Sequence, residues 1–244
     1  MTAPLPTPLS TALEDPLQAY EVARGIWGLR GTGHDAAQYD SIGTAYDIVG
    51  AMDLYHRIFW GVSTRAYRQF VEKAWEECGD GLMLDAGCGS MLFSARAHLR
   101  SQQGAVIGLD ASLRMLTLAQ TRLGGSPQAR RVALLRGDLF RNQMRSAMFD
   151  VVTCLHVAHV LDDLDRLLAE ARRVLKPGGR LFLTSVVQVN GWRDRYLRAL
   201  ARRGIMATPR STGDIVDALH RVLRTDPRWR LTGNMLFVET VAPS

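Results

Sequence analysis

The segment Leu84-Asp85-Ala86-Gly87-Cys88-Gly89-Ser90 constrains the fold most, because it leads from a short apolar run into a helical pattern. Glycine lacks a Cβ atom, so a Gly-x-Gly turn can bend sharply and let a ligand's polar groups approach the main chain. A strand, an acidic residue, two spaced glycines and a helix are typical of nucleotide-binding α/β proteins. Gly-x-Gly also occurs in plain tight turns, so the segments that follow must show whether this turn belongs to a nucleotide-binding fold.

Downstream of this turn, short apolar runs alternate with amphipathic segments. The runs predict strands at 82–85, 105–109, 132–135, 149–154 and 180–187, and the amphipathic segments predict helices at 91–100, 113–123 and 164–175. Apolar strands separated by helices are typical of a parallel sheet covered on both faces. Two further helices, at 190–203 and 212–224, precede strands at 228–232 and 235–241 that flank the hairpin turn Gly233-Asn234.

The expected fold class is therefore α/β, with a doubly wound, mostly parallel, seven-stranded, Rossmann-like sheet that ends in an antiparallel hairpin. Residues 1–17, rich in Pro, Ser and Thr, are expected to form a flexible leader. Residues 18–78 are expected to form an N-terminal helical cap on the substrate side. Residues 79–244 then form the core, with a variable insert near 188–212 that could cover a pocket or mediate dimerisation.

Composition narrows the class of protein. A chain of 244 residues with 47% hydrophobic residues suits one large globular domain, and none of its apolar runs approaches the roughly 18 residues needed to cross a bilayer. The first ten residues contain no basic residue, which argues against a secretory signal. The three cysteines, Cys78, Cys88 and Cys154, lack metal-ligand spacing. We expect a cytoplasmic protein without a metal.

The net charge of +6 raises nucleic acid as a partner, but the basic residues argue against it. Lys73 and Lys176 are the only lysines, and the arginines are spread along the chain without interleaved aromatics. The expected partners are a small-molecule acceptor and, as a further option, a second copy of the chain in a homodimer.

Four acidic residues lie at the ends of predicted strands: Asp85, Asp110, Asp138 and Asp150. In an open parallel sheet, ligands bind beyond the carboxyl ends of the strands, so the side chains that follow the first three strands should converge on one crevice. At this crevice the chain resembles the class I S-adenosylmethionine-dependent methyltransferases, in the small-molecule branch that includes the ubiquinone and menaquinone methyltransferases. The matching motifs are Asp85-Ala86-Gly87-Cys88-Gly89, Gly108-Leu109-Asp110-Ala111-Ser112, Gly137-Asp138, Phe149-Asp150-Val151-Val152 with His159 and Asp163, and Arg173-Val174-Leu175-Lys176-Pro177-Gly178-Gly179.

The resemblance implies S-adenosylmethionine as the cofactor. The residues that it assigns to cofactor binding are Tyr46, Asp85, Gly87, Cys88, Gly89, Asp110, Ala111, Met115, Asp138, Leu139 and Cys154. Asp110 would accept hydrogen bonds from the ribose hydroxyls, Asp138 would accept one from the adenine amine, and Asp85 would orient the methionine amino group or the glycine turn. Alternatives stay open: Asp110 as a helix cap, Asp138 as a solvated carboxylate, and Met115 and Cys154 as ordinary buried residues.

Two features bear on catalysis. Many family members have a third glycine where this chain has Met91, which puts the seating of the cofactor in question. His156 and His159 follow the fourth core strand, near the expected position of the methyl group, and either is a candidate general base. The alternative for His159 is a packing role. The aromatic residues Phe59 and Trp60 resemble the substrate entry region of the quinone methyltransferases, or form a plain helical core.

The predicted function is methyl transfer from S-adenosylmethionine to an O, N or C nucleophile of a small organic acceptor, such as a quinone-like compound or a natural-product intermediate. One alternative is a non-catalytic partner subunit with the methyltransferase fold. An RNA methyltransferase is disfavoured by the lack of a basic, aromatic-studded face, and an aminopropyl transferase by the lack of acidic residues between Cys154 and His159.

Overall fold

The computed structural model describes residues 4–30, 52–101 and 103–243. Tyr46, predicted to contact the cofactor, lies outside the described residues. The helices are α1 (Thr7–Ala12), α3 (Asp53–Tyr55), α4 (Thr64–Cys78), α5 (Ala95–Arg100), α6 (Leu113–Leu123), α7 (Leu164–Val174), α8 (Arg193–Arg202) and α9 (Thr212–Leu223), with short turns η1 (Pro16–Gln18), η2 (His56–Trp60) and η3 (Pro127–Arg131). The strands are β1 (Ala19–Ala23), β2 (Ile26–Leu29), β3 (Leu82–Ala86), β4 (Ala105–Asp110), β5 (Val132–Arg136), β6 (Phe149–Leu155), β7 (Leu175–Val186), β8 (Arg228–Thr232) and β9 (Met235–Val241).

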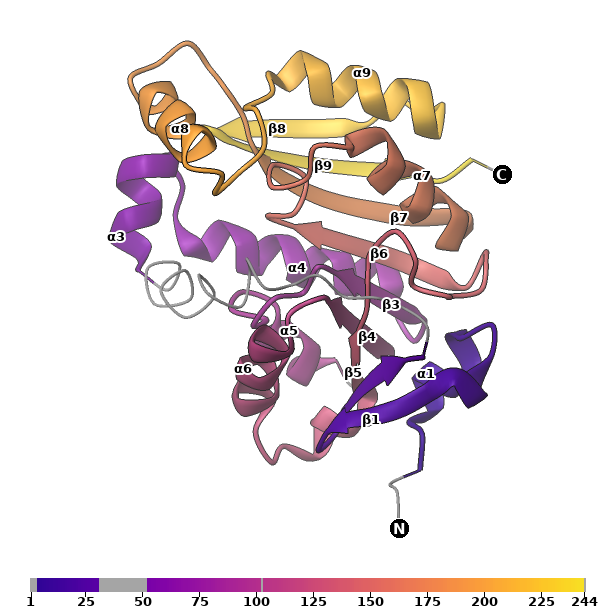
Figure 1. Ribbon diagram of the computed structural model, residues 1–244. Coiled ribbons are helices and arrows are strands. Elements are labelled where there is room, and N and C mark those ends of the chain that lie inside the picture. Colours follow the sequence, from indigo (N-terminus) through magenta and orange to yellow (C-terminus); the bar gives the residue numbers. More distant parts are fainter. Residues whose placement is uncertain (1–3, 31–51, 102, 244) are drawn as a thin grey trace.

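All of these strands belong to one sheet, in the order β1-β2-β5-β4-β3-β6-β7-β9-β8 (Figure 1). From β3 the chain proceeds outward through β4 and β5, then returns to the other side of β3 with β6 and β7. Strand β9 inserts antiparallel between β7 and β8. The doubly wound, mostly parallel sheet with a terminal antiparallel hairpin is confirmed, and the order of strands switches direction at β3.

The sheet has two more strands than the seven predicted. Strands β1 and β2 form an antiparallel pair, and β2 extends the sheet by pairing in parallel with β5. The expectation that residues 18–78 form a helical cap is therefore wrong for β1 and β2. The cap is helical from Asp53 to Cys78, where α3, η2 and α4 follow one another.

The flexible leader is also contradicted, because α1 packs onto the body of the protein. Leu9 and Leu13 are fully buried, and they join the core that α7 and α9 cover. Pro8 lies in the first turn of α1, where its missing N–H costs nothing. The Pro, Ser and Thr content of this segment did not indicate that Leu9 and Leu13 would be buried.

Successive residues along the strands point to opposite faces of the sheet, which explains the two layers of helices. Leu84, Ile107 and Val152 face α1, α7 and α9. Met83, Val106 and Phe182 face the helix side that includes α4 and α8, and α6 packs over Leu134. Among the described residues, no helix is long and apolar enough to cross a membrane.

Most predicted element limits agree within three residues, with two larger differences. Helix α5 begins at Ala95, not at 91, since residues 87–94 form an extended turn. Strand β7 begins at Leu175, not at 180, because Leu175 already pairs with Phe149. The side chain of Ser112 caps α6 by accepting a hydrogen bond from the Met115 N–H (3.1 Å).

Candidate active site

The glycine turn between β3 and α5 lies at the carboxyl edge of the sheet. Gly87 and Gly89 have φ values of 67° and 51°, in the left-handed region that favours glycine. The N–H groups of Gly87 and Cys88 both donate to the Leu109 carbonyl, at 2.8 and 3.0 Å. A Cβ atom on Gly87 would overlap a methyl group of Val157. The turn is thus held against β4 and against the segment after β6, with its backbone bare.

Asp110, at the end of β4, ties the turn to the next helix. One carboxylate oxygen accepts the Gly89 N–H (2.8 Å) and the other accepts the Ser112 N–H (2.9 Å). The side chain stays half-buried at the sheet edge. The structure therefore brings Asp110 and the glycine turn together, as predicted, and gives Asp110 part of the capping role that was its alternative interpretation.

Asp85, near the end of the neighbouring strand β3, faces inward and is 1% exposed. Its carboxylate accepts hydrogen bonds from the Ser94 hydroxyl (2.8 Å), His98 Nε2 (3.0 Å) and the Thr153 hydroxyl (2.9 Å). Trp75 Nε1–H donates to His98 Nδ1 (3.0 Å), so His98 must carry its proton on Nε2. This arrangement favours the role of orienting the turn over direct contact with a ligand.

Met91 occupies the position of the third glycine, and the turn forms around it. Its φ value is 54°, a conformation that costs a side-chain-bearing residue about 1–2 kcal/mol. The side chain is buried, with its Cε atom where a Cβ on Gly108 would lie, beside Cys88 Sγ. The absent side chain of Gly108 therefore makes room for Met91. Burial raises the pKa of the Cys88 thiol, and the carboxylates of Asp110 and Asp85 raise it further.

The remaining predicted cofactor residues divide into two groups. Ala111, Met115 and Asp138 are half-buried at the sheet edge, and the Met115 methyl group would lie 3.4 Å from a Cβ on Gly89. Asp138 accepts the Phe140 N–H (2.8 Å). Leu139 and Cys154 instead line a small apolar cavity between the sheet and α7. Burial raises the pKa of the Cys154 thiol, followed by a smaller effect of Asp85, which leaves it an apolar filler without nucleophilic character.

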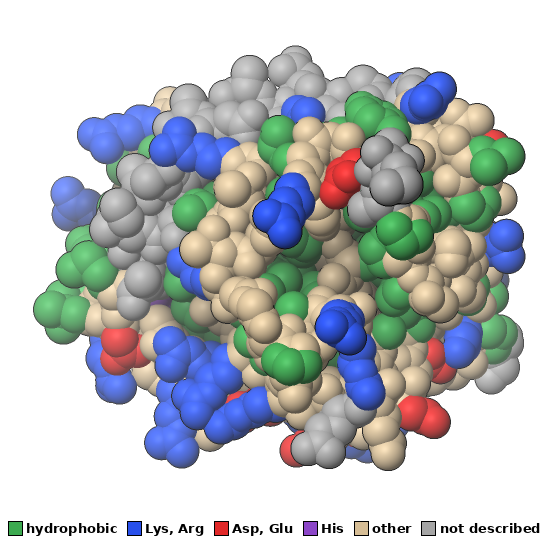
Figure 2. Space-filling view, turned by 90° about the horizontal axis from the view of Figure 1, so that it is seen from below, with side chains coloured by type: hydrophobic (Ala, Val, Ile, Leu, Met, Phe, Trp, Pro, Cys, Tyr) green, Lys and Arg blue, Asp and Glu red, His purple; other side chains and the backbone are tan. Residues whose placement is uncertain are grey.

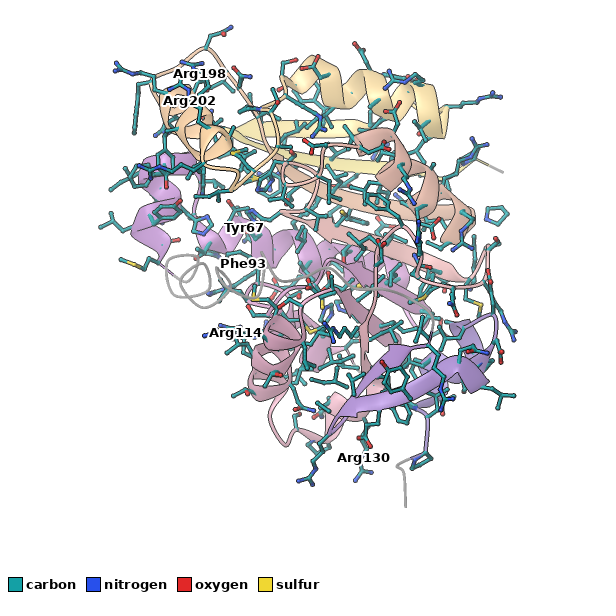
Figure 3. The ribbon with its side chains drawn as sticks, viewed as in Figure 1. Tyr67, Phe93, Arg114, Arg130, Arg198 and Arg202 are labelled. Carbon is teal, nitrogen blue, oxygen red and sulfur yellow. The ribbon has the colours of Figure 1, made fainter. Side chains whose placement is uncertain are left out.

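His156 follows β6 directly, at φ 60°, and lies in a group of aromatic rings. Its ring centroid is 4.5 Å from that of Tyr67, 5.5 Å from that of Phe93 and 6.0 Å from that of His56. Figure 3 labels Tyr67 and Phe93, which approach each other between α4 and the turn after β3. No described residue offers a hydrogen bond to His156 Nε2, which is shielded from solvent. Burial lowers the pKa of His156 well below 6.5, and His159 and His56 lower it further.

His159 is buried and has a structural partner. Its Nδ1 accepts the Val186 N–H (3.3 Å). Burial lowers its pKa to about 4, with a smaller contribution from Arg210. The guanidinium of Arg210 donates to the carbonyls of Ala158 and Leu161, at 2.8 and 2.9 Å. Of the two candidate bases, only His156 has a solvent-shielded ring nitrogen without a hydrogen-bond partner among the described residues.

The buried, neutral His159 predicts a dependence of stability on pH. Because the pKa is about 4 when folded and about 6.5 when unfolded, the unfolded chain binds a proton first as the pH falls. We expect the free energy of unfolding to fall by about 3 kcal/mol between pH about 6.5 and about 4 from this residue alone. Chemical denaturation across this range would show a shallower fall for His159→Gln, which keeps an acceptor for the Val186 N–H. Equal slopes would contradict the assignment.

Few features of the sequence indicate which residues surround His156. The spacing of Tyr67, Phe70, Val71 and Ala74 matches one face of a helix, and this could have placed Tyr67 inside. For His56, whose Nδ1 lies 3.2 Å from the Tyr67 hydroxyl, no local pattern exists. Its η2 turn reaches the site through tertiary packing.

Comparison with known proteins bears on this edge of the sheet. A family model described as a methyltransferase domain matches residues 84–183, which include the glycine turn, Asp110, Asp138 and both histidines. Residues 84–183 are thus similar to a methyltransferase domain, and the fold is that of the S-adenosylmethionine-dependent methyltransferases. One solved protein with this fold, geranyl diphosphate C-methyltransferase from Streptomyces coelicolor, is described in complex with S-adenosyl-L-homocysteine. That structure has a TM-score of 0.60 at 16% identity, covering 73% of this chain and 75% of the other, and shows the shared fold.

Curated relatives of this methyltransferase domain include a demethylmenaquinone methyltransferase of Thermobifida fusca. It is 32% identical over 148 residues, which cover 61% of this chain and 59% of the relative. Across the first matches the alignment spans between a half and two thirds of the curated relatives' length. The [4+2]-cyclase SpnF shares the fold as well, with a TM-score of 0.66 at 16% identity over 85% of this chain and 95% of its own.

Proposed function

We propose that this protein transfers a methyl group from S-adenosylmethionine to a small, planar aromatic acceptor of the quinone type. The observation that carries the proposal is the joining of the glycine turn to the Asp110 carboxylate at the carboxyl edge of the sheet. The backbone of Gly87 and Gly89 is bare there, and the half-buried carboxylates of Asp110 and Asp138 lie at the ends of the next two strands. Carboxylate acceptors beside a turn without side chains fit an adenosine with an amino acid tail.

On the acceptor side, the residues suit an apolar ring with an ionisable hydroxyl. When bound, S-adenosylmethionine supplies a methyl group on a positively charged sulfur, so the protein needs mainly to align a nucleophile and accept its proton. Tyr67, Phe93 and His56 form an aromatic wall, and His156 stays neutral beside them with Nε2 unpartnered. His156 Nε2 would accept the hydroxyl proton of the acceptor, and S-adenosylmethionine would supply the methyl group that replaces this proton. The names of the curated relatives support a quinone-type acceptor.

The proposal is tested by calorimetric titration with S-adenosylmethionine and S-adenosylhomocysteine, followed by assays with soluble hydroquinones. We expect micromolar binding of both cofactor forms. We further expect His156→Phe to lower kcat about hundredfold, the lower range for general base catalysis, with cofactor affinity unchanged. The matched variant His159→Gln should leave kcat within a fewfold of wild type. A His156→Phe variant with wild-type kcat would remove His156 from the chemistry.

A non-catalytic partner subunit remains the second candidate, and Met91 is the observation that favours it. A side chain with φ 54° stands where family members often have glycine. The fold also serves SpnF, described as a cyclase. Failure to bind either cofactor form would support this second candidate and would contradict the first.

A further inference from the structure

Two helical segments beside the proposed acceptor site, α3–η2 and α8, pack together and expose apolar and arginine side chains. The segment α3–η2 packs on α8 through aromatic rings: Tyr55 and Tyr196 share a hydroxyl hydrogen bond of 2.8 Å, and the rings of Phe59 and Tyr196 lie 4.4 Å apart. Both lie at the end of the molecule where the carboxyl ends of β6 and β7 point (Figure 1). His56 of the same segment turns inward to the His156 cluster. The inner side of this pair thus borders the proposed acceptor site, and its outer side exposes side chains to solvent.

Large hydrophobic side chains concentrate on this outer side. Five of the ten large hydrophobics that are exposed among the described residues belong to it: Met52, Leu54, Ile58, Val189 and Trp192. Leu54 is 64% exposed and Trp192 is 58% exposed. Arg193 links the two helices, because its Nε donates to the Ile58 carbonyl (2.8 Å) while its guanidinium lies 4.8 Å from the Trp192 ring centroid. Ile58 and Trp192 thus both contact Arg193, and a concentration of exposed apolar side chains of this kind marks a contact site.

Arginines border the patch along α8. Arg195, Arg198 and Arg202 recur at helical spacing and are all exposed. No described carboxylate lies within ion-pair distance of them, whereas Arg57 on the neighbouring segment pairs with Asp53 at 2.6 Å. Arg198 and Arg202 project outward from α8 (Figure 3). The face of the molecule that is seen from below shows many more Lys and Arg side chains than Asp and Glu side chains (Figure 2).

We propose that this face, defined by Met52, Leu54, Ile58 and Trp192 with Arg195, Arg198 and Arg202, docks on an anionic lipid bilayer. Apolar side chains beside a basic stripe fit the boundary between acyl chains and anionic headgroups, where both are satisfied at once. A second copy of the chain would bring the arginine stripes toward each other in a two-fold interface. A nucleic acid would leave the apolar patch in water. A bilayer surface is the occupant whose chemistry matches both halves of the face.

Docking would place the acceptor site beside the membrane. A lipid-soluble aromatic acceptor could then reach the His156 cluster without crossing water. That last step rests on the proposed function, whereas docking itself does not. The two can therefore fail separately.

The test is sedimentation of the full chain with vesicles of phosphatidylcholine, with and without phosphatidylglycerol. We expect binding to the anionic vesicles that weakens with added salt. The double variant Arg198→Gln/Arg202→Gln should bind about twentyfold more weakly, since each arginine near an anionic surface contributes about fivefold. The matched double variant Arg130→Gln/Arg131→Gln removes two exposed arginines of η3 and should bind as wild type.

A second pair of variants tests the apolar half. Leu54→Ser/Trp192→Ser should weaken binding to both vesicle types, while Trp229→Ser/Leu231→Ser on the exposed strand β8 should not. Affinity for S-adenosylmethionine should stay unchanged in all four double variants, which separates loss of docking from loss of the cofactor site. Docking is contradicted if the wild-type protein does not bind vesicles, or if the η3 control variant loses as much vesicle binding as Arg198→Gln/Arg202→Gln. It is also contradicted if centrifugation shows a dimer that Leu54→Ser/Trp192→Ser dissociates.

Discussion

Asp110→Ala is expected to weaken S-adenosylmethionine binding by at least about hundredfold while the protein stays folded. The carboxylate is proposed to accept both ribose hydroxyls, and hydrogen bonds to a charged group contribute about 1.5–3 kcal/mol each. The variant also frees the N–H groups of Gly89 and Ser112, both now bound to Asp110. Their loss should lower the free energy of unfolding by only about 1–2 kcal/mol, because the carboxylate is half-buried. Calorimetric titration and chemical denaturation measure the two effects.

Two variants make this result specific. Asp165→Ala on α7 removes a carboxylate that pairs with Arg221 at the surface (2.6 Å), and cofactor affinity should not change. Asp110→Asn keeps an acceptor for one N–H but presents an amide donor, so it should bind the cofactor nearly as weakly as Asp110→Ala. Affinity within about threefold of wild type in both Asp110 variants would reduce Asp110 to its capping role, with no contact to the ribose.

The sequence predicted the parts of the site that depend on residues close to one another in the chain. The glycine turn, Asp110 and Ser112 follow strands that read clearly as short apolar runs, and parallel strands bring their carboxyl ends to one edge. Strands β1 and β2 escaped prediction because β2 depends on the free edge of β5, which no local pattern reveals. The same holds for His56, whose neighbours in space are distant in sequence.

Met91 and Asp85 show a second limit. The sequence revealed the departure at Met91 but not its accommodation, which needs the missing side chain of Gly108 on a neighbouring strand. It revealed an acidic residue at the end of β3 but left two roles open for it. Only the three donors around Asp85, from the turn, from α5 and from β6, distinguish these roles.

Asp85→Ala is expected to lower the free energy of unfolding by about 3–5 kcal/mol. The substitution leaves three buried donors, on Ser94, His98 and Thr153, without their acceptor, and each such loss costs about 1–3 kcal/mol. Because whole domains are stable by about 5–15 kcal/mol, the variant would be close to unfolding at room temperature. Chemical denaturation measures the loss, with Asp165→Ala as the matched surface carboxylate.

Asp85→Asn refines this result, because the three donors are not equivalent. The hydroxyls of Ser94 and Thr153 can reverse and accept a hydrogen bond, whereas His98 cannot, since Trp75 Nε1–H occupies its Nδ1. An asparagine that turns its oxygen to His98 and its amide to Thr153 keeps most contacts, so we expect a smaller loss than for Asp85→Ala. The additional substitution Trp75→Phe removes the donor to His98 Nδ1, so His98 can move its proton to that nitrogen. This should narrow the difference in unfolding free energy between Asp85→Ala and Asp85→Asn. Near-wild-type stability of Asp85→Asn with cofactor affinity as low as in Asp110→Ala would instead place Asp85 against the methionine amino group, and its role as an anchor of the turn would be wrong.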